Sequence, residues 1–223
     1  EIFDQYQKIK NKNIGTRKFI NEIGWREFAY HLVYHFPKML KKNLRQNFDN
    51  FPWSTNKIHL EKWKRGKTGY PLVDAAMRQI YEIGWMHNRL RMVTGSFLVK
   101  HLRINWLEGE KYFKDTLLDY DTANNVSGWQ WISGCGADAA PYFRIFNPIT
   151  QSEKFDPNGQ FIKKWVPELK SIPKKFIHKP WEIPKDLAAK INFNLKQNYY
   201  EPIVNHAEAR QAALAAFEYT KKK

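Results

Sequence analysis

Cysteine is almost absent from this chain, since Cys135 is the only one among 223 residues. A single cysteine excludes a disulfide within the chain and favours a reducing compartment. It also excludes the usual zinc sites, which need several cysteines, and we expect no metal site. Long apolar runs are lacking too. The longest, such as the one ending at residues 97–99, fall far short of the roughly 20 residues that span a bilayer, so we expect no membrane segment.

Strand patterns are also missing, because no convincing stretch alternates apolar and polar residues and no internal repeat is present. Apolar residues instead recur near every 3.6 positions. Helix signals predict helices after a cap at Thr16, over Pro71–Ile83 with Gly84 ending it, from about Trp85 to His101, from Glu110 to about Leu118, and from Ala207 to Tyr219. A turn at residues 156–159 and a proline-punctuated connection precede the last helix. The sequence therefore predicts an all-α fold, with residues 1–223 forming one domain.

Acidic side chains are few beside basic ones: 22 Asp and Glu against 37 Lys and Arg, a net charge of +15. Residues 1–70 hold 15 basic and 6 acidic side chains and residues 151–223 hold 14 and 8, whereas residues 71–150 balance at 8 and 8. This charge indicates a partner with many phosphates, attracted by lysine-rich flanks around a more specific middle. The alternative, that the lysines only keep the surface soluble, explains the asymmetry less well.

Tryptophan is abundant, with nine in the chain, and several lie between residues 85 and 148 beside carboxylates, amides and arginines. An indole is large and its N–H group needs a partner when it is buried, so an ordinary helical core uses tryptophan sparingly. The segment therefore indicates a site for a flat ligand that stacks or carries electrons.

Helical spacing places Glu22, Trp25 and Arg26 on one face of the first long helix. A carboxylate, an indole and a guanidinium there could bond a base edge, stack on it and hold a phosphate. A solvated ion pair beside a core tryptophan is the alternative.

Arg89 and Arg91 differ by two positions and must point to nearly opposite sides of a helix. One can face an external ligand while the other reaches inward for the carboxylate that a buried arginine needs. Asp119 and Asp121 are the nearby candidates, and we expect the pair Arg91–Asp119.

The same geometry sends Trp129 and Trp131 to opposite sides, one towards the interior and the other towards a substrate. Asn124 and Asn125 precede them. These asparagines are either turn residues or amides aimed at a heterocycle.

Three motifs, TGYPLVDAAMRQ, GWMHNRLRM and WQWISGCGADAAPYFRIFNP, closely resemble the flavin-binding domain of class I cyclobutane pyrimidine dimer photolyases, in the photolyase and cryptochrome family. The resemblance runs from about Phe19 to the C-terminal helix. It implies an all-helical domain that holds a U-shaped FAD. It also implies a light-dependent lyase that repairs dimers in DNA by electron transfer from fully reduced flavin.

The resemblance implies that Trp129, Trp106 and Trp53 relay electrons from the surface to photoexcited flavin. Without it, we would expect Trp53 and Trp106 to be core residues. Asn125 matches the amide beside the reactive flavin nitrogen. A neutral amide tolerates the anionic reduced flavin, which an aspartate would repel, so Asn125 favours repair over signalling.

The other matched positions fall into two groups. Expected FAD contacts are Phe19, Arg91, Asp119, Tyr120, Asp121 and Asn125, and expected dimer or DNA contacts are Glu22, Trp25, Arg26, Asn88, Arg89, Met92, Trp131, Arg144 and Gln151. The Glu22 carboxyl should hydrogen-bond the dimer, and Trp25 and Trp131 should pack against the flipped-out lesion, whose stacking is already weakened. Met92, with His87-Asn88 in place of a His-His pair, favours dimers over 6-4 photoproducts.

Two features of such photolyases have no counterpart here: the N-terminal α/β domain that holds the antenna chromophore, and the early Thr-Ser-rich segment that grips the FAD phosphates. Position 19 is phenylalanine where many relatives have tryptophan. We therefore expect the C-terminal catalytic portion of a longer photolyase, monomeric and cytoplasmic, or nuclear in a eukaryote. The rival functions are a cryptochrome-type photoreceptor and a flavin-free basic protein that binds nucleic acid.

Overall fold

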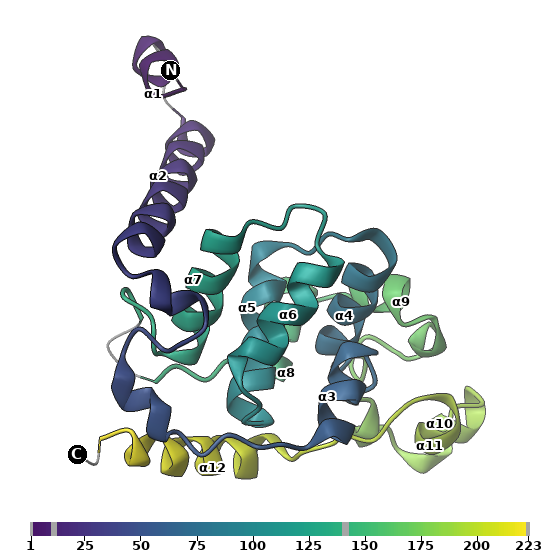
Figure 1. The fold of residues 1–223 in the computed structure, drawn as a ribbon. Coiled ribbons are helices and arrows are strands. Elements are labelled where there is room, and N and C mark those ends of the chain that lie inside the picture. Colours follow the sequence, from purple (N-terminus) through teal and green to yellow (C-terminus); the bar gives the residue numbers. More distant parts are fainter. Residues whose placement is uncertain (1, 10–12, 140–142, 222–223) are drawn as a thin grey trace.

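The computed structural model describes residues 2–9, 13–139 and 143–221. Its α-helices are α1 (Ile2–Lys8), α2 (Ile14–His35), α3 (Lys57–Lys64), α4 (Pro71–Ile83), α5 (Asn88–Ser96), α6 (Trp106–Thr116), α7 (Thr122–Ser133), α8 (Pro148–Phe155), α9 (Gln160–Trp165), α10 (Lys185–Lys190), α11 (Leu195–Asn198) and α12 (His206–Tyr219), as Figure 1 shows. Within these ranges there is no strand, only an isolated bridge between Ser54 and Ile104. The prediction of an all-α fold is confirmed.

Shorter helical turns join these helices. The 3-10 turns are η1 (Pro37–Leu40), η2 (Gln46–Asn50), η4 (Pro167–Leu169) and η5 (Pro180–Glu182), and η3 (Phe97–His101) is a π-helical turn that directly follows α5. Two of them, η4 and η5, lie within residues 167–184, where prolines had predicted irregular backbone. The π turn was not foreseen, because a shift from i+4 to i+5 bonding leaves the apolar spacing almost unchanged.

Helix α4 has the predicted bounds, with Pro71 in its first turn and Gly84 ending it in the left-handed conformation at φ 65°. Most of its residues are buried, and among them is the carboxylate of Asp74, which accepts several hydrogen bonds. The Asp74 carboxylate accepts bonds from the backbone N–H groups of Thr68 and Gly69 and from the Tyr199 hydroxyl. Burial raises the pKa of Asp74, and these hydrogen bonds oppose that shift. The carboxylate therefore ties α4 to the C-terminal segment.

Three predicted helix starts were wrong by a few residues, each because an unforeseen side chain caps the helix. Asn13 rather than Thr16 caps α2, and its side chain accepts from the Thr16 backbone N–H at 2.8 Å. The helix expected from Trp85 starts at Asn88, where the His87 ring accepts from the Arg89 N–H. Asn105 starts α6 well before the predicted Glu110.

Helix α12 lies along the base of the molecule in Figure 1 and packs against the π turn η3. The two are joined by a bond between His101 Nε2 and His206 Nδ1, 2.8 Å apart. Burial, and then the neighbouring His206, lower the pKa of His101 to about 3. The contact therefore joins two neutral rings at neutral pH.

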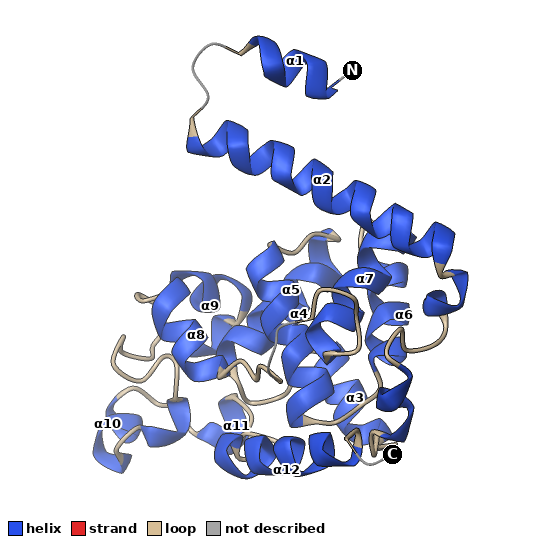
Figure 2. Ribbon diagram, turned by 90° about the vertical axis from the view of Figure 1, so that its left-hand side faces the viewer, coloured by secondary structure: helices blue, strands red, loops and turns tan. Residues whose placement is uncertain are grey.

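The main core gathers side chains from α4 to α7, and a smaller cluster around Ile162, Leu169 and Ile177 fills the region of α9 and the following turns. Helix α2 reaches this core only near its C-terminal end, through Leu32, and it crosses over α7, as Figures 1 and 2 both show. Only Ala29 and Leu32 of α2 are buried. The helix therefore forms a separate wall above the bundle.

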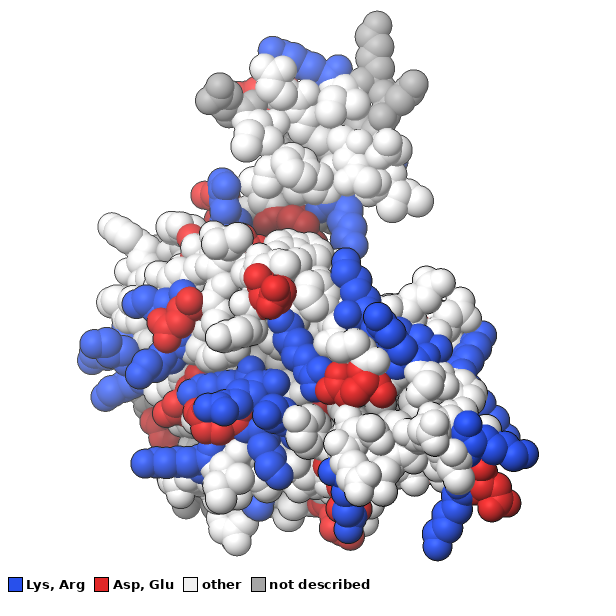
Figure 3. All heavy atoms as spheres, turned by 90° about the vertical axis from the view of Figure 1, so that its right-hand side faces the viewer, with Lys and Arg blue, Asp and Glu red and all other residues white. Residues whose placement is uncertain are grey.

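Basic side chains are spread over the face in Figure 3, with acidic ones among them. That distribution agrees with a diffuse positive field over this face. In the described part of the chain, no helix is both long and apolar enough to cross a membrane. The same ranges contain no cluster of three His, Cys, Asp or Glu side chains suited to a metal ion.

Candidate functional site

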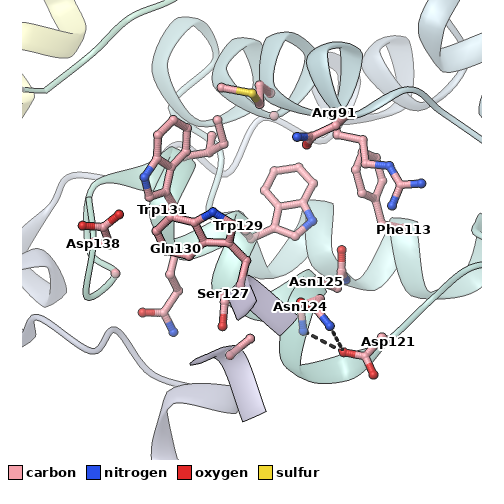
Figure 4. A pocket seen from close by; sticks show the side chains of 18 of the residues that line it. Arg91, Phe113, Asp121, Asn124, Asn125, Ser127, Trp129, Gln130, Trp131 and Asp138 are labelled. Carbon is pink, nitrogen blue, oxygen red and sulfur yellow. Dashed lines mark hydrogen bonds between the residues drawn. The ribbon is translucent and has the colours of Figure 1, made fainter. Parts of the chain in front are cut away.

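A cavity of about 680 Å³ lies between α2 and the bundle. It is lined by α2, α5 and α7, by single residues of η1 and α6, and by the segments before α5 and after α6 and α7. Figure 4 shows the Trp129 ring in the middle of this wall, Trp131 beside it and the Asp121–Asn124 pair at the other end. The lining combines indoles, amides, carboxylates and two half-buried arginines, Arg89 and Arg91. A cavity with this lining suits a flat ligand with polar edges.

Helix α7 supplies one wall, and both asparagines lie in its first turns rather than in a turn between elements. The Asp121 side chain caps the helix and accepts from the Asn124 backbone N–H at 2.8 Å and from Asn124 Nδ2 at 2.7 Å. Asn125 Nδ2 instead faces Glu110, with 3.3 Å to its carboxylate Oε1. The alternative that these asparagines are turn residues is therefore wrong. The Asp121 side chain bonds the amide of Asn124, whereas the amide of Asn125 lies on the cavity wall and has no bond to that side chain.

Two polar atoms on this wall are buried without a partner among the described residues: Nε1 of Trp129 and Oγ of Ser127. An unmet N–H or hydroxyl in a dry interior is unfavourable by roughly 1–3 kcal/mol. Both side chains line the cavity. Their unmet hydrogen-bonding capacity fits a polar ligand seated against α7.

The predicted pair of Arg91 and Asp119 is present, with Arg91 Nη2 at 2.9 and 2.7 Å from the two carboxylate oxygens. Arg91 Nε also donates to the Met86 carbonyl at 2.8 Å. Arg89 points elsewhere, with its guanidinium 4.8 Å from the centre of the Phe155 ring. The expected pair Arg91–Asp119 therefore forms, but it is not buried: the two side chains are 27% and 49% exposed, and Arg89 lines the same cavity.

Helix α2 supplies the opposite wall and is fastened to α7 by the Tyr30 hydroxyl, which donates to Asp121 Oδ2 at 2.5 Å. This bond raises the pKa of Tyr30. Burial opposes ionisation of Asp121, but the bonds from Tyr30 and Asn124 outweigh it and lower the pKa of Asp121. Asp121 therefore acts at once as helix cap and as the anchor of α2.

The ion pair considered for Glu22 and Arg26 does not form, because Arg26 pairs with its neighbour Glu27 at 2.8 Å. Trp25 is not a core residue either, since 53% of its surface is exposed. Glu22 and Trp25 both line the cavity. Glu22 and Trp25 thus face the cavity, as contact with a bound base would require.

The three relay candidates differ in depth: Trp129 is 4% exposed, Trp106 is 1% exposed and Trp53 is partly exposed. Trp129 lies against α6, where a Cβ built on Gly109 would be 2.1 Å from its ring. Gly109 is one turn after Trp106. The Ser54 N–H donates to the Arg103 carbonyl at 2.7 Å, which brings Trp53 beside the start of α6. The three candidates are therefore linked through α6.

The cavity brings together most of the predicted positions. Those that line it are Glu22, Trp25, Asn88, Arg89, Arg91, Met92, Asp119, Tyr120, Asp121, Asn125, Trp129 and Trp131. Those that do not are Phe19, Arg26, Arg144 and Gln151, besides the relay candidates Trp53 and Trp106. Phe19 is 60% exposed on α2 and does not line the cavity, and its contact with FAD stays a prediction. Gln151 is on α8, and Arg144 precedes that helix.

Some residues of the site were not predicted. Tyr30 bonds Asp121, Glu110 accepts from both Tyr120 and Asn125, and Ser127 offers an unmet hydroxyl. Ser127 could have been found from helical phase, since it lies three positions after Asn124 and four before Trp131 on α7. Tyr30 and Glu110 could not, because their contacts join different helices.

Comparison with known proteins agrees with this geometry. Residues 19–219 match the family described as the FAD binding domain of DNA photolyase. The chain belongs to this family. Residues 140–142 of the third motif lie outside the described residues.

Among curated photolyase relatives, the deoxyribodipyrimidine photo-lyase of Agrobacterium fabrum is 53% identical over 92% of this chain and 43% of its own length. The Escherichia coli protein of the same name is 52% identical over 92% of this chain and 42% of its own length. The chain thus spans less than half the length of these relatives.

A crystal structure described as a bacterial class III photolyase from Agrobacterium tumefaciens matches with a TM-score of 0.91 and 50% identity. It covers 96% of this chain and 44% of that protein. The photolyase family and fold are therefore established. Membership of class I was predicted from the motifs, and it stays a prediction because this neighbour is described as class III.

FAD is the cofactor that this photolyase domain binds, and the residues of the cavity fit it. The unpartnered Trp129 Nε1 and Ser127 Oγ, the amide of Asn125 and the Arg91–Asp119 pair offer donors and acceptors to a ring system and its polar chain.

Proposed function

We propose that the protein to which this domain belongs repairs cyclobutane pyrimidine dimers in DNA, using light and reduced FAD. The observation that supports the proposal best is the two-sided cavity. One wall, α7, presents the unpartnered Trp129 Nε1 and Ser127 Oγ, and the other, α2, presents Glu22 and Trp25. A single cavity can therefore hold a cofactor and a base-like substrate side by side.

Bound FAD would supply a light-excited electron donor. The chain's own residues would hold it: Arg91 and Asp119 at one end, Asn125 and Trp129 along α7, and Asp121 where α2 meets α7. Asn125 carries no charge, so it would tolerate an anionic reduced cofactor. Its Nδ2 is engaged by Glu110, which limits rotation of the amide.

The substrate would enter beside α2. Glu22 would hydrogen-bond the dimer, and Trp25 and Trp131 would pack against its bases, while Asn88, Arg89 and Met92 lie on the α5 side of the same cavity. Arg26, Arg144 and Gln151 lie outside the cavity and would contact flanking DNA. The net charge of +15 would favour the phosphate backbone.

Trp129, Trp106 and Trp53 would return electrons to oxidised cofactor from the protein surface. Their burial supports this order, since Trp129 lines the cavity, Trp106 is fully buried and Trp53 is partly exposed. We further propose class I membership, a monomeric state, a reducing compartment and an antenna chromophore held by a part of the protein outside this chain.

The deciding experiment measures loss of thymine dimers from irradiated DNA by the full-length protein under blue light, with reduced FAD bound. We expect repair in light and none in darkness. Glu22→Ala should lower the rate on the order of tenfold or more, because a hydrogen bond to the dimer is lost. Glu108→Ala, an exposed carboxylate on α6 outside the cavity, is the matched control.

Absence of repair by the flavin-loaded protein would contradict the proposal and favour a photoreceptor. Absence of a flavin absorption band after reconstitution would favour a flavin-free nucleic-acid-binding protein instead. Salt dependence of DNA binding would not separate repair from flavin-free nucleic-acid binding, because both rest on contacts with phosphates.

A further inference from the structure

Trp106 makes a hydrogen bond that links it to a polar pair outside the cavity. Its Nε1–H donates to Asn43 Oδ1 at 2.9 Å, and Asn43 Nδ2 donates to Asp49 Oδ1 at 2.6 Å. Asn43 follows η1, Asp49 is in η2, and neither lines the cavity. The two side chains therefore act on the buried indole from the side away from the ligand.

The two partners of Asn43 require the same orientation of its amide. An indole nitrogen can only donate, so it needs the amide oxygen, and an ionised carboxylate can only accept, so it needs the amide nitrogen. Asp49 therefore keeps Oδ1 of Asn43 aimed at Trp106. An amide next to the carboxylate is also polarised, which makes its oxygen a better acceptor.

The loop that carries Asn43 is fastened to α7. Gln130 Nε2 donates to the carbonyls of Met39 at 2.7 Å and Lys42 at 3.0 Å, and Gln130 Oε1 accepts from the Leu44 N–H at 2.9 Å. Gln130 is fully buried and directly follows Trp129. The position of Asn43 is thus fixed relative to the relay before any electron moves.

The two buried indoles of the relay consequently differ in one respect. Trp106 has an oriented acceptor at its N–H group, whereas Nε1 of Trp129 has no partner among the described residues. Loss of an electron gives an indole positive charge and makes its N–H a much stronger donor. A hydrogen bond to a charged group is worth more than one to the neutral group, so an acceptor stabilises the oxidised ring preferentially.

We propose that Asn43, held by Asp49, is a positioning residue that makes Trp106 easier to oxidise than Trp129 and so drives the electron relay in one direction. This inference rests on the proposed function. When bound, light-excited oxidised FAD would supply the electron acceptor. Trp129 would give up one electron, Trp106 would give one electron to oxidised Trp129, and Trp53 would give one to oxidised Trp106. An external thiol restores Trp53. The Trp106 proton stays on Nε1, because an amide oxygen is too weak a base to remove it.

The test uses Asn43→Leu in the full-length protein with oxidised FAD bound, followed by transient absorption and steady photoreduction with a thiol present. We expect the yield of lasting photoreduction to fall on the order of tenfold or more, because the stabilisation lost at Trp106 is that of a hydrogen bond to a charged group. Asn50→Leu is the matched control, an exposed asparagine on the same turn as Asp49, and should match the parent protein.

A second readout does not involve the flavin. In the full-length protein without FAD, the indole ¹H–¹⁵N signal of Trp106 should move upfield in Asn43→Leu and its N–H should exchange faster with solvent, while Asn50→Leu leaves both unchanged. Asp49→Asn removes the charge at an exposed position and provides a variant expected to fold. It should lower photoreduction to a level between the parent and Asn43→Leu.

Trp106→Phe separates failure of this inference from failure of the relay. If Trp106→Phe blocks photoreduction but Asn43→Leu and Asp49→Asn behave like the parent, the role of Asn43 is wrong and the relay stands. If Trp106→Phe photoreduces normally, the relay itself is wrong, and this inference falls with it. Dimer repair by chemically reduced protein tests the proposed function independently of both outcomes.

Discussion

At the scale of single residues, the site depends on small groups placed against large ones. Gly109 leaves room for the Trp129 ring, and Asp121 serves both the N-terminus of α7 and the Tyr30 hydroxyl. The Gly109–Trp129 and Tyr30–Asp121 contacts each join two helices. A small change at such a contact should alter the stability of the protein or its affinity for FAD. Two substitutions test this.

Gly109→Ala should destabilise the protein by about 1–3 kcal/mol, the usual range for overpacking a buried site. The added Cβ would lie 2.1 Å from the Trp129 ring, so the ring or α6 must move. Urea unfolding measures the change. Gly24→Ala is the control, because nothing lies within 4 Å of its Cβ position in α2. Equal stabilities of the two variants would contradict the close packing of α6 and α7.

Arg91→Gln should weaken FAD binding by the full-length protein, on the order of tenfold, because Asp119 then loses its countercharge and the Met86 carbonyl its donor. Calorimetric titration of the flavin-free protein with FAD gives the affinity. Arg65→Gln, which removes a looser and more exposed pair with Glu61, should leave that affinity unchanged. An unaltered affinity in Arg91→Gln would remove this arginine from the proposed cofactor site.

At the scale of elements, side-chain caps decided the helix bounds. Gly84 ends α4 as predicted, because a left-handed residue after an apolar helix has a plain sequence signature. The sequence did not predict the caps Asn13, His87 and Asn105, because asparagine and histidine are also common in turns and loops near helix ends. The contact of α12 with η3 lies beyond any local pattern, because it joins His101 to a residue more than a hundred positions away.

The histidine contact predicts a pH dependence of stability. The folded pKa of His101, about 3, is below its ordinary value of 6.5. The unfolded chain therefore binds a proton that the folded chain does not, and stability falls as the pH drops from about 6.5 towards 3. The slope contributed by one such group is at most about 1.4 kcal/mol per pH unit.

Urea unfolding between pH 7 and pH 4 measures this slope. His101→Asn should flatten it, and His31→Asn, at an exposed position on α2, is the matched control. An equal slope in the parent and in His101→Asn would show that the buried pair is not responsible for the loss of stability.

At the scale of the whole molecule, the bundle buries far more of its side chains than α2 does. The bundle has a continuous core, whereas α1 has no buried residue and α2 has two. Several large apolar side chains of α2 are exposed, among them Ile14, Phe19 and Tyr34.

The mainly helical class and most cavity residues could be predicted from the sequence, because helical periodicity and sequence motifs are properties of short segments. The one-sided seating of α2 could not, since it depends on contacts between distant segments.

Native-state hydrogen exchange should reveal this inequality. Backbone amides in residues 14–24 of α2 should exchange faster than those of α4 by a factor of at least about a hundred, because few tertiary contacts oppose their local opening. Amides in residues 29–35, closer to the Tyr30–Asp121 bond, should be intermediate. Uniform protection along α2 would contradict the prediction.

The bridge between Ser54 and Ile104 bears on how sequence change affects electron tunnelling. It is made by backbone atoms, with the Ser54 N–H bonded to the Arg103 carbonyl. Tunnelling rates fall steeply with separation, so they are sensitive to any drift between Trp53 and Trp106. A backbone link can be formed by nearly any amino acid. Substitutions in the surrounding loops would therefore leave the distance between Trp53 and Trp106 unchanged. That distance depends on the backbone pairing rather than on particular side chains.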